Sequence, residues 1–164
     1  MNIKNKPWLK NYPKGVSSEI EFAEYSSIGD MFEKTCKRFT SKVAFTNFGV
    51  SLTFDELHEK SLNLASFLQN ELKLSHGSSV AIMMPNLLQY PISTFGILKA
   101  GLIVENVNPL YTERELEKQL LDSESESIII LENFCHILDK IIHKTNIKNI
   151  IITSLGELLG TKGY

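Results

Sequence analysis

The chain has 164 residues, a length typical of one domain. Hydrophobic residues make up 43% of it, which supports a real core and excludes a largely disordered chain. The formal net charge of −2 argues against a nucleic-acid-binding protein, because such proteins usually carry a concentrated basic face. The sequence shows neither a signal peptide nor a membrane-spanning apolar run, and Cys36 and Cys135 form no paired motif. We therefore expect a cytoplasmic protein with reduced, buried thiols.

Residues 1–27 are predicted to form an irregular arm, because prolines, a glycine and a run of serines interrupt any hydrophobic period. This arm is either solvated, with one aromatic ring packed, or in weak peripheral contact with the anionic inner face of a membrane. Both interpretations rest on its lysines and aromatic residues, which are Lys4, Lys6, Lys10, Lys14, Trp8 and Tyr12.

The first regular elements follow the arm. Apolar side chains recur at helical spacing over 28–39, with Ser27 as a plausible N-cap. Two short strands, 43–48 and 50–54, are predicted to form a tight hairpin, at a sheet edge or in a small separate sheet. Thr53 and Glu56 then form a capping-box pattern, so a helix is expected to begin there and to end near Gly77.

Strands and helices alternate through the rest of the chain, which indicates parallel βαβ units. We therefore predict a three-layer α/β fold, with helices on both faces of a mostly parallel sheet. The expected strands are 80–84, 102–106 (or 107), 127–131 and 149–153; the expected helices are 87–100 with Pro91 in its first turn, 112–120 opened by a Thr112–Glu115 capping box, and 134–142. Helix 87–100 is apolar nearly all round and is expected to need cover on every side.

The residues alone indicate almost no chemistry. Gly-rich phosphate loops, a nucleophile elbow and zinc motifs are all missing from the sequence. The four histidines, His58, His76, His136 and His143, show no metal-ligand spacing; His58 is placed on the charged side of its helix and His76 in a turn. We therefore assign no catalytic, cofactor-binding or metal-binding residue. The acidic run from Asp122 through 123–127 is interpreted as a solvated loop.

Three polar residues lie in or just after expected strands, and ligands of parallel sheets bind beyond the carboxyl ends of the strands. Asn86 and Asn108 follow two of the expected strands, and we favour a capping or turn role for both over ligand binding. Glu105 interrupts an otherwise apolar strand. It is expected to face the sheet edge or to pair with a cation, and a functional role is the less favoured alternative.

A long run of this sequence resembles a known family. The segments are LTFDEL (52–57) and VAIMMPNLLQYPISTFGILKAGLIVENVNPLYTERELEKQL (80–120), supported by 8–20, 27–39 and 136–153. They resemble the N-terminal end of bacterial long-chain fatty-acid–CoA ligases, which belong to the adenylate-forming, AMP-binding superfamily. The resemblance implies that residues 28–164 form an incomplete N-terminal subdomain of the acyl-CoA synthetase fold. It also implies a family reaction that uses ATP, Mg and CoA to make acyl-CoA.

The departure from the family pattern limits what the resemblance implies. The Ser/Thr/Gly-rich loop that binds ATP phosphates in the family has no counterpart here, and the sequence ends at GELLGTKGY (156–164). We expect the chain alone to be inactive and to bind no cofactor. Its expected partner is the remainder of the ligase, with self-association driven by helix 87–100. The alternatives are a non-catalytic module that pairs with a split ligase or another ligase subunit, and, less favoured, a small free-standing nucleotide-binding protein.

Overall fold

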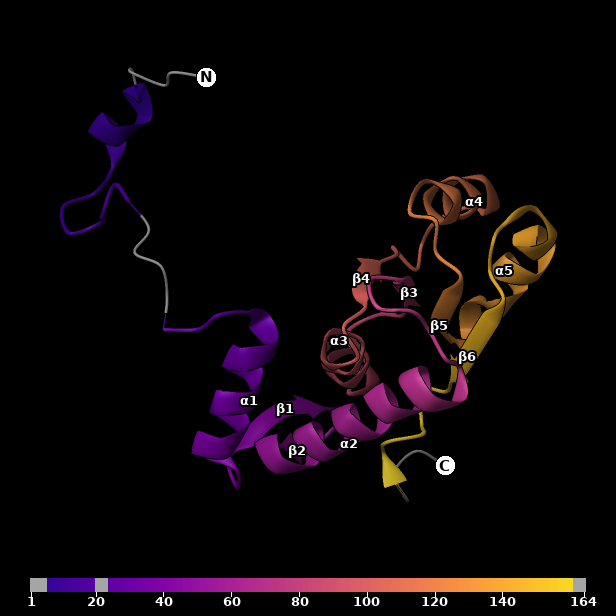
Figure 1. Ribbon diagram of the computed structural model, residues 1–164, viewed down its shortest axis with the longest axis horizontal. Helices are drawn as coiled ribbons and strands as arrows, with labels where there is room; N and C mark the ends of the chain where they lie inside the picture. Colours follow the sequence, from indigo (N-terminus) through magenta and orange to yellow (C-terminus); the bar gives the residue numbers. More distant parts are fainter. Residues whose placement is uncertain (1–5, 20–23, 161–164) are drawn as a thin grey trace.

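A computed structural model describes residues 6–19 and 24–160. Its centre is a four-stranded sheet in the order β4-β3-β5-β6, and every neighbouring pair is parallel (Figure 1). The strands are β3 (Ser79–Met83), β4 (Ile103–Asn106), β5 (Ser127–Leu131) and β6 (Asn149–Thr153). The predicted parallel α/β sheet is therefore confirmed, and β4 and β6 form its two edges.

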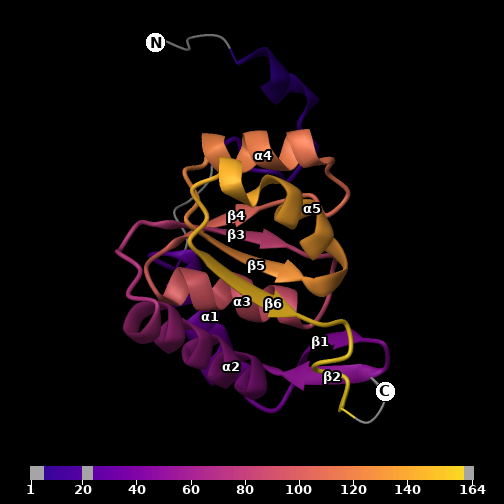
Figure 2. The same ribbon diagram turned by 90° about the vertical axis from the view of Figure 1, so that its right-hand side faces the viewer.

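Helices cover both faces of this sheet, as predicted. They are α2 (Phe54–Ser66) and α3 (Gln89–Lys99) on one face, and α4 (Glu113–Asp122) and α5 (Cys135–Ile141) on the other. Figure 2 shows the sheet between these two layers. The fold is thus the expected three-layer arrangement.

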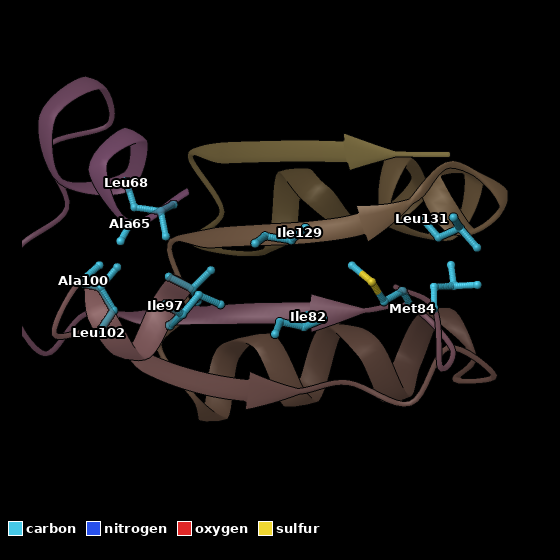
Figure 3. Packing of buried hydrophobic residues seen from close by; sticks show 11 residues of the cluster. Ala65, Leu68, Ile82, Met84, Ile97, Ala100, Leu102, Ile129 and Leu131 are labelled. Carbon is cyan, nitrogen blue, oxygen red and sulfur yellow. The ribbon is translucent and has the colours of Figure 1, made fainter. Parts of the chain in front are cut away.

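Successive side chains of the central strands point to opposite faces of the sheet, so the core of the sheet forms two clusters. On β3, Ile82 packs toward α2 and α3, whereas Met83 packs toward α4 and α5. On β5, Ile129 and Ile130 divide in the same way. Figure 3 shows the first of these clusters, in which Ile82 and Ile129 lie near side chains of α2 and α3. Both faces of β3 and β5 are apolar because a parallel sheet covered by two helical layers has no solvated face.

The amino-terminal elements pack beside this sheet. Helix α1 (Ile28–Phe39) begins as predicted, because the Ser27 side chain accepts a hydrogen bond from the Asp30 N–H at 3.0 Å. Strands β1 (Val43–Asn47) and β2 (Val50–Thr53) form an antiparallel hairpin in a sheet of their own. The two turn residues, Phe48 and Gly49, both have positive φ, as this kind of tight hairpin turn requires. The hairpin prediction is confirmed.

Helix α2 ends earlier than expected. Thr53 and Glu56 form the predicted capping box, and a wider π-helical turn, Phe67–Glu71, follows α2. The helical path stops at Leu72 because Lys73 takes a left-handed conformation, with φ of 53°. The predicted end near Gly77 is therefore wrong: Gly77 lies in the later turn that leads into β3, where it also has positive φ.

Helix α3 is covered by the chain itself. It begins at Gln89, so Pro91 lies in its first turn as predicted. Every residue of α3 is buried or half-buried, since α2, α1 and the sheet surround it. On the α1 side, the rings of Phe32 and Phe95 stack with centroids 3.8 Å apart. The chain itself therefore supplies much of the cover that α3 was expected to need, and self-association stays a prediction.

The amino-terminal arm is described only in part, because residues 1–5 and 20–23 of the predicted irregular arm lie outside the described residues. Within it, Pro7–Asn11 form a short 3-10 helix, since Pro7 sets the first turn. Trp8 remains 47% exposed and Tyr12 43% exposed. Throughout residues 6–19 and 24–160, none of the helices combines the length and apolar character needed to cross a membrane.

Candidate functional site

The carboxyl edge of the sheet is the place where the topology gathers polar side chains. Asn106, the last residue of β4, is held from two sides. Its Oδ1 accepts a hydrogen bond from the Tyr90 hydroxyl at 2.8 Å, and its carbonyl oxygen accepts one from Gln119 Nε2 at 3.0 Å. These contacts join α3 and α4 to the end of β4. These hydrogen bonds hold the end of β4 to α3 and α4, so the polar side chains have a structural role here.

Our sequence reasoning did not single out Asn106, Tyr90 or Gln119. Tyr90 lies on the helix that was expected to be apolar nearly all round, and Gln119 lies on the helix opened by Thr112; only the fold brings them to the same strand end. The available signal was Asn106 itself, because a polar residue that closes an apolar strand points to the carboxyl edge of the sheet.

The two asparagines that the sequence placed at strand ends behave differently from each other. Asn108 Oδ1 accepts a hydrogen bond from the Leu110 N–H at 3.0 Å, which confirms its turn role. Asn86 lies exposed in the bend before α3, and its carbonyl oxygen accepts a hydrogen bond from Asn47 Nδ2 at 3.2 Å. The N-cap position of α3 is Leu88, which has no capping side chain. Of the expected capping or turn role, Asn86 has only the second, because it lies in the bend and α3 begins three residues after it.

The amino terminus of α4 carries its own carboxylates. The N–H and the hydroxyl of Thr112 both donate to Glu115 Oε2, at 2.8 and 2.7 Å. These hydrogen bonds lower the pKa of Glu115. Together with Glu113 in the same turn, Glu115 places negative charge where the helix dipole is positive. This helix end is therefore already compensated and repels a phosphate rather than binding it.

Glu105 lies beside an open cleft of about 470 Å³ between β4 and α4. Its carboxylate accepts a hydrogen bond from the Ser125 hydroxyl at 2.6 Å, and the hydroxyl of Ser125 is 3.0 Å from that of Ser79. Of the two alternatives, the edge position is confirmed, and the hydrogen-bond partner of the carboxylate is the Ser125 hydroxyl and not a cation. Ser125 and Ser127 are buried, so the interpretation of 122–127 as a wholly solvated loop is wrong: its acids are exposed and these two serines face inward.

The histidines and cysteines form no reactive group. Across the residues that the structure describes, groups of three metal-ligating side chains are absent. His58 is not on a charged face as expected, since its Nε2 is buried and its ring lies 6.0 Å from that of Phe32. Burial raises the pKa of the Cys36 thiol to about 11, with Asp55 adding to the effect. Burial and Glu132 also raise the pKa of Cys135. Both thiols stay protonated near neutral pH and are poor nucleophiles.

This parallel sheet, with two helical layers and a separate hairpin, fits the family that the sequence resembles. The profile of the family described as AMP-binding enzyme matches residues 32–161. The chain belongs to the AMP-binding enzyme family.

Several of the curated relatives that it matches are long-chain-fatty-acid–CoA ligases. The protein of Haemophilus influenzae is 51% identical over 154 residues, which cover 94% of this chain and 27% of the relative. The protein of Escherichia coli O6:H1 is 50% identical, over 95% of this chain and 28% of the relative. The protein of Bacillus subtilis is 38% identical, over 94% of this chain and 27% of the relative. The chain thus spans little more than a quarter of the length of these relatives.

Solved structures confirm the fold. An anthranilate–CoA ligase in complex with anthranoyl-AMP superposes with a TM-score of 0.74 and 21% identity, over 80% of this chain and 25% of that protein. A long-chain-fatty-acid–CoA ligase from Archaeoglobus fulgidus gives a TM-score of 0.73 at 22% identity, over 85% of this chain and 30% of that protein. The four-stranded sheet and its helices therefore form a recurrent unit of acyl-CoA ligase structures.

Proposed function

We propose that this chain is one part of a long-chain fatty-acid–CoA ligase, whose complete form converts a fatty acid, ATP and CoA to acyl-CoA, AMP and diphosphate. The observation that carries the proposal is 51% identity to a ligase of this kind over 94% of the chain. In this proposal the chain supplies a rigid sheet and its covering helices, and the remainder of the ligase supplies the groups that bind ATP and transfer the acyl group.

The described residues do not fit ATP or Mg. Adenylation requires donors, and usually a cation, aimed at the charge that develops on phosphate oxygens. At the amino end of α4, Glu113 and Glu115 oppose an anion. At the amino end of α3, Pro91 removes one of the free N–H donors. A lone helix terminus contributes about 0.3–1 kcal/mol, whereas micromolar binding needs about 8 kcal/mol. We expect the chain alone to bind ATP·Mg²⁺ without useful affinity.

Acyl-CoA formation is the direct test. The purified chain is assayed with palmitate, ATP, Mg²⁺ and CoA, first alone and then after co-expression with the Haemophilus influenzae ligase that lacks the segment matched by this chain. We expect no product from either piece alone and product from the pair. That ligase's own segment, supplied in the same way, is the positive control. Product with the control segment and none with this chain would contradict the proposal, as would saturable ATP binding by the chain alone.

The second candidate function is a non-catalytic module that pairs with the remainder of a split ligase. One observation favours it: strand β6 ends the sheet, and its outer edge is unpaired among the described residues. An unpaired strand edge can pair with a strand of a partner protein. The same co-expression separates the two functions, because stable pairing without acyl-CoA formation supports the module and pairing with product supports the ligase.

We also propose that the chain acts in the cytoplasm, with its arm in weak contact with the inner face of a membrane. The exposure of Trp8 and Tyr12 beside lysines supports the second part, because aromatic rings and cations both favour an anionic lipid surface.

A further inference from the structure

Two polar side chains of α2 are buried without a partner on the side where α1 and α3 pack. Ser61 is fully buried, and the Nε2 atom of His58 is also shielded from solvent. Among residues 6–19 and 24–160, neither Ser61 Oγ nor His58 Nε2 has a hydrogen-bond partner. Most buried polar atoms in native proteins are paired with protein groups or with ordered water, because an unpaired one is destabilising. Both atoms therefore indicate a small polar ligand.

The surroundings of these two atoms are apolar. The His58 ring lies 6.0 Å from the ring of Phe32 on α1, and Phe32 stacks on Phe95 of α3. Leu57, which precedes His58, is fully buried in the same cluster as Phe32. Helices α1, α2 and α3 all contact one another (Figure 1). Because these hydrocarbon side chains offer no hydrogen bond, the ligand has to supply the partner of both atoms.

The spacing of His58 and Ser61 suits a bridging water molecule. Residues three apart on a helix are surface neighbours, with their Cβ atoms about 5–6 Å apart. The two side chains form no direct hydrogen bond. Two hydrogen bonds of about 2.8 Å through a water would span such a separation. A water and a serine hydroxyl each donate and accept, so the bridge forms with either tautomer of the imidazole, and two partners are the usual minimum for a buried water.

We propose that one water molecule is bound in the interface of α1, α2 and α3, where it bridges His58 Nε2 and Ser61 Oγ. A larger ligand does not suit this interface, because α2 and α3 approach closely one turn away. There, a Cβ at Gly96 would lie 2.8 Å from Leu64 Cδ2. The water site belongs to this chain alone and does not depend on the proposed function.

The sign of one substitution tests the site. Ser61→Ala takes one of two partners from the water and should destabilise the fold, whereas removal of an unpaired buried hydroxyl would stabilise it. Ser66→Ala is the matched control, since Ser66 is the exposed serine of the same helix and the change in helix propensity is the same. In urea denaturation, we expect Ser61→Ala to raise the equilibrium constant of unfolding about three- to tenfold relative to Ser66→Ala.

A double-mutant cycle tests whether the two residues share the ligand. His58→Phe replaces the imidazole with an apolar ring, and His58→Gln keeps a polar atom near the place of Nε2. We expect His58→Phe to destabilise the chain and His58→Gln to recover part of the loss. Ser61→Ala should have little further effect in the His58→Phe background, because the bridge is already broken. Additive losses would overturn the bridge.

Contacts between water and the wild-type chain give a readout that needs no core variant. A water held at this site should give nuclear Overhauser contacts to the His58 ring protons. We expect these contacts in the wild type and in Ser66→Ala, and their loss in Ser61→Ala. Coupling of the two side chains without such contacts would indicate a direct hydrogen bond and overturn the proposal. A Ser61→Ala chain that is more stable than Ser66→Ala would overturn it as well.

Discussion

Gly96 on α3 faces Leu64 on α2 without room for a further carbon atom. A Cβ at position 96 would lie 2.8 Å from Leu64 Cδ2 and 3.1 Å from Leu64 Cβ. Because Leu64 Cβ is fixed to the backbone of α2, a rotamer change cannot relieve the contact fully. This contact sets how closely the two helices that cover one face of the sheet approach each other.

We predict that Gly96→Ala lowers the free energy of unfolding by about 1–2 kcal/mol. Overpacking costs about 1–3 kcal/mol, and the better helix propensity of alanine returns up to about 1 kcal/mol. Urea denaturation measures the difference. Gly29 is the matched control, since a Cβ there would lie an ordinary 3.7 Å from the Ser27 hydroxyl oxygen. Gly29→Ala should not destabilise, and adding Leu64→Ala should remove the clash at Gly96→Ala; if the two glycine variants are equally stable, the close approach is not tight.

The capping box of α2 is expected to matter for stability. Thr53 Oγ1 accepts from the Glu56 N–H at 3.2 Å, while the Thr53 N–H donates to Glu56 Oε2 at 2.8 Å. Thr53→Ala removes the first of these bonds and should lower the free energy of unfolding by about 0.5–2 kcal/mol. Thr53→Ser keeps the hydroxyl and should lie close to wild type in the same denaturation experiment. Identical losses in both variants would show that the methyl group, not the cap, is responsible.

The same caps predict acid sensitivity. Hydrogen bonds from the backbone and side chain of Thr53 lower the pKa of Glu56, and those from Thr112 lower the pKa of Glu115. A carboxyl group whose pKa is lower in the folded state stabilises the fold above its ordinary value of 4.5, and this contribution is lost as the pH falls through the lowered pKa. We expect the urea concentration at the unfolding midpoint to decrease as the pH is lowered from about 5 to about 3. Replacing both acids, Glu56→Gln and Glu115→Gln, should flatten this dependence; an unchanged slope would contradict it.

Thiol reactivity should follow burial. Because burial raises the pKa of Cys36 to about 11, its thiolate fraction at about pH 8 is near one in a thousand. Cys36 should react with a disulfide reagent only upon unfolding. Cys135 is half-buried, so it should react in the native state, but more slowly than a free thiol. Cys36→Ala and Cys135→Ala assign the two phases, and rapid native-state labelling of Cys36 would contradict the packing between α1 and α2.

The arm offers an optical test of membrane contact. Trp8 is the only tryptophan in the chain, so its fluorescence reports on the arm alone. We predict a small blue shift of its emission with vesicles that contain anionic lipid, reversed by added salt because the attraction is electrostatic. Vesicles of neutral lipid are the control. An emission spectrum that does not change when anionic vesicles are added would favour a solvated arm.

Most of the fold was predictable because its signals are local. The βαβ alternation, the capping boxes at Thr53 and Thr112 and the hairpin turn at Gly49 each depend on residues that are neighbours in sequence. The end of α2 was not predictable from the sequence. A π-helical turn follows α2 and Lys73 has a left-handed conformation, and the spacing of apolar residues indicates neither.

The polar contacts depended on the tertiary fold and were largely missed. The expected absence of catalytic, cofactor-binding and metal-binding residues stays a prediction. The contact between Asn106 and Tyr90 joins two elements through the order of the strands, which a local pattern does not contain. For the same reason His58 was placed on the charged side of its helix: the burial of its Nε2 comes from α1 lying against α2, and helical periodicity alone did not show where α1 packs.

The strand order also has a consequence during synthesis on the ribosome. Strand β3 is made first but lies between β4 and β5, so neither of its backbone edges has a partner when it emerges. Strand β5 begins at Ser127, 44 residues after β3 ends at Met83, which is a delay of about 2–9 seconds at roughly 5–20 residues per second. During that interval, the nascent chain exposes a strand of which four of the five residues are buried in the finished fold. Exposed apolar surface and unpaired strand edges promote aggregation, so the interval before Ser127 emerges is when the nascent chain is most open to that hazard.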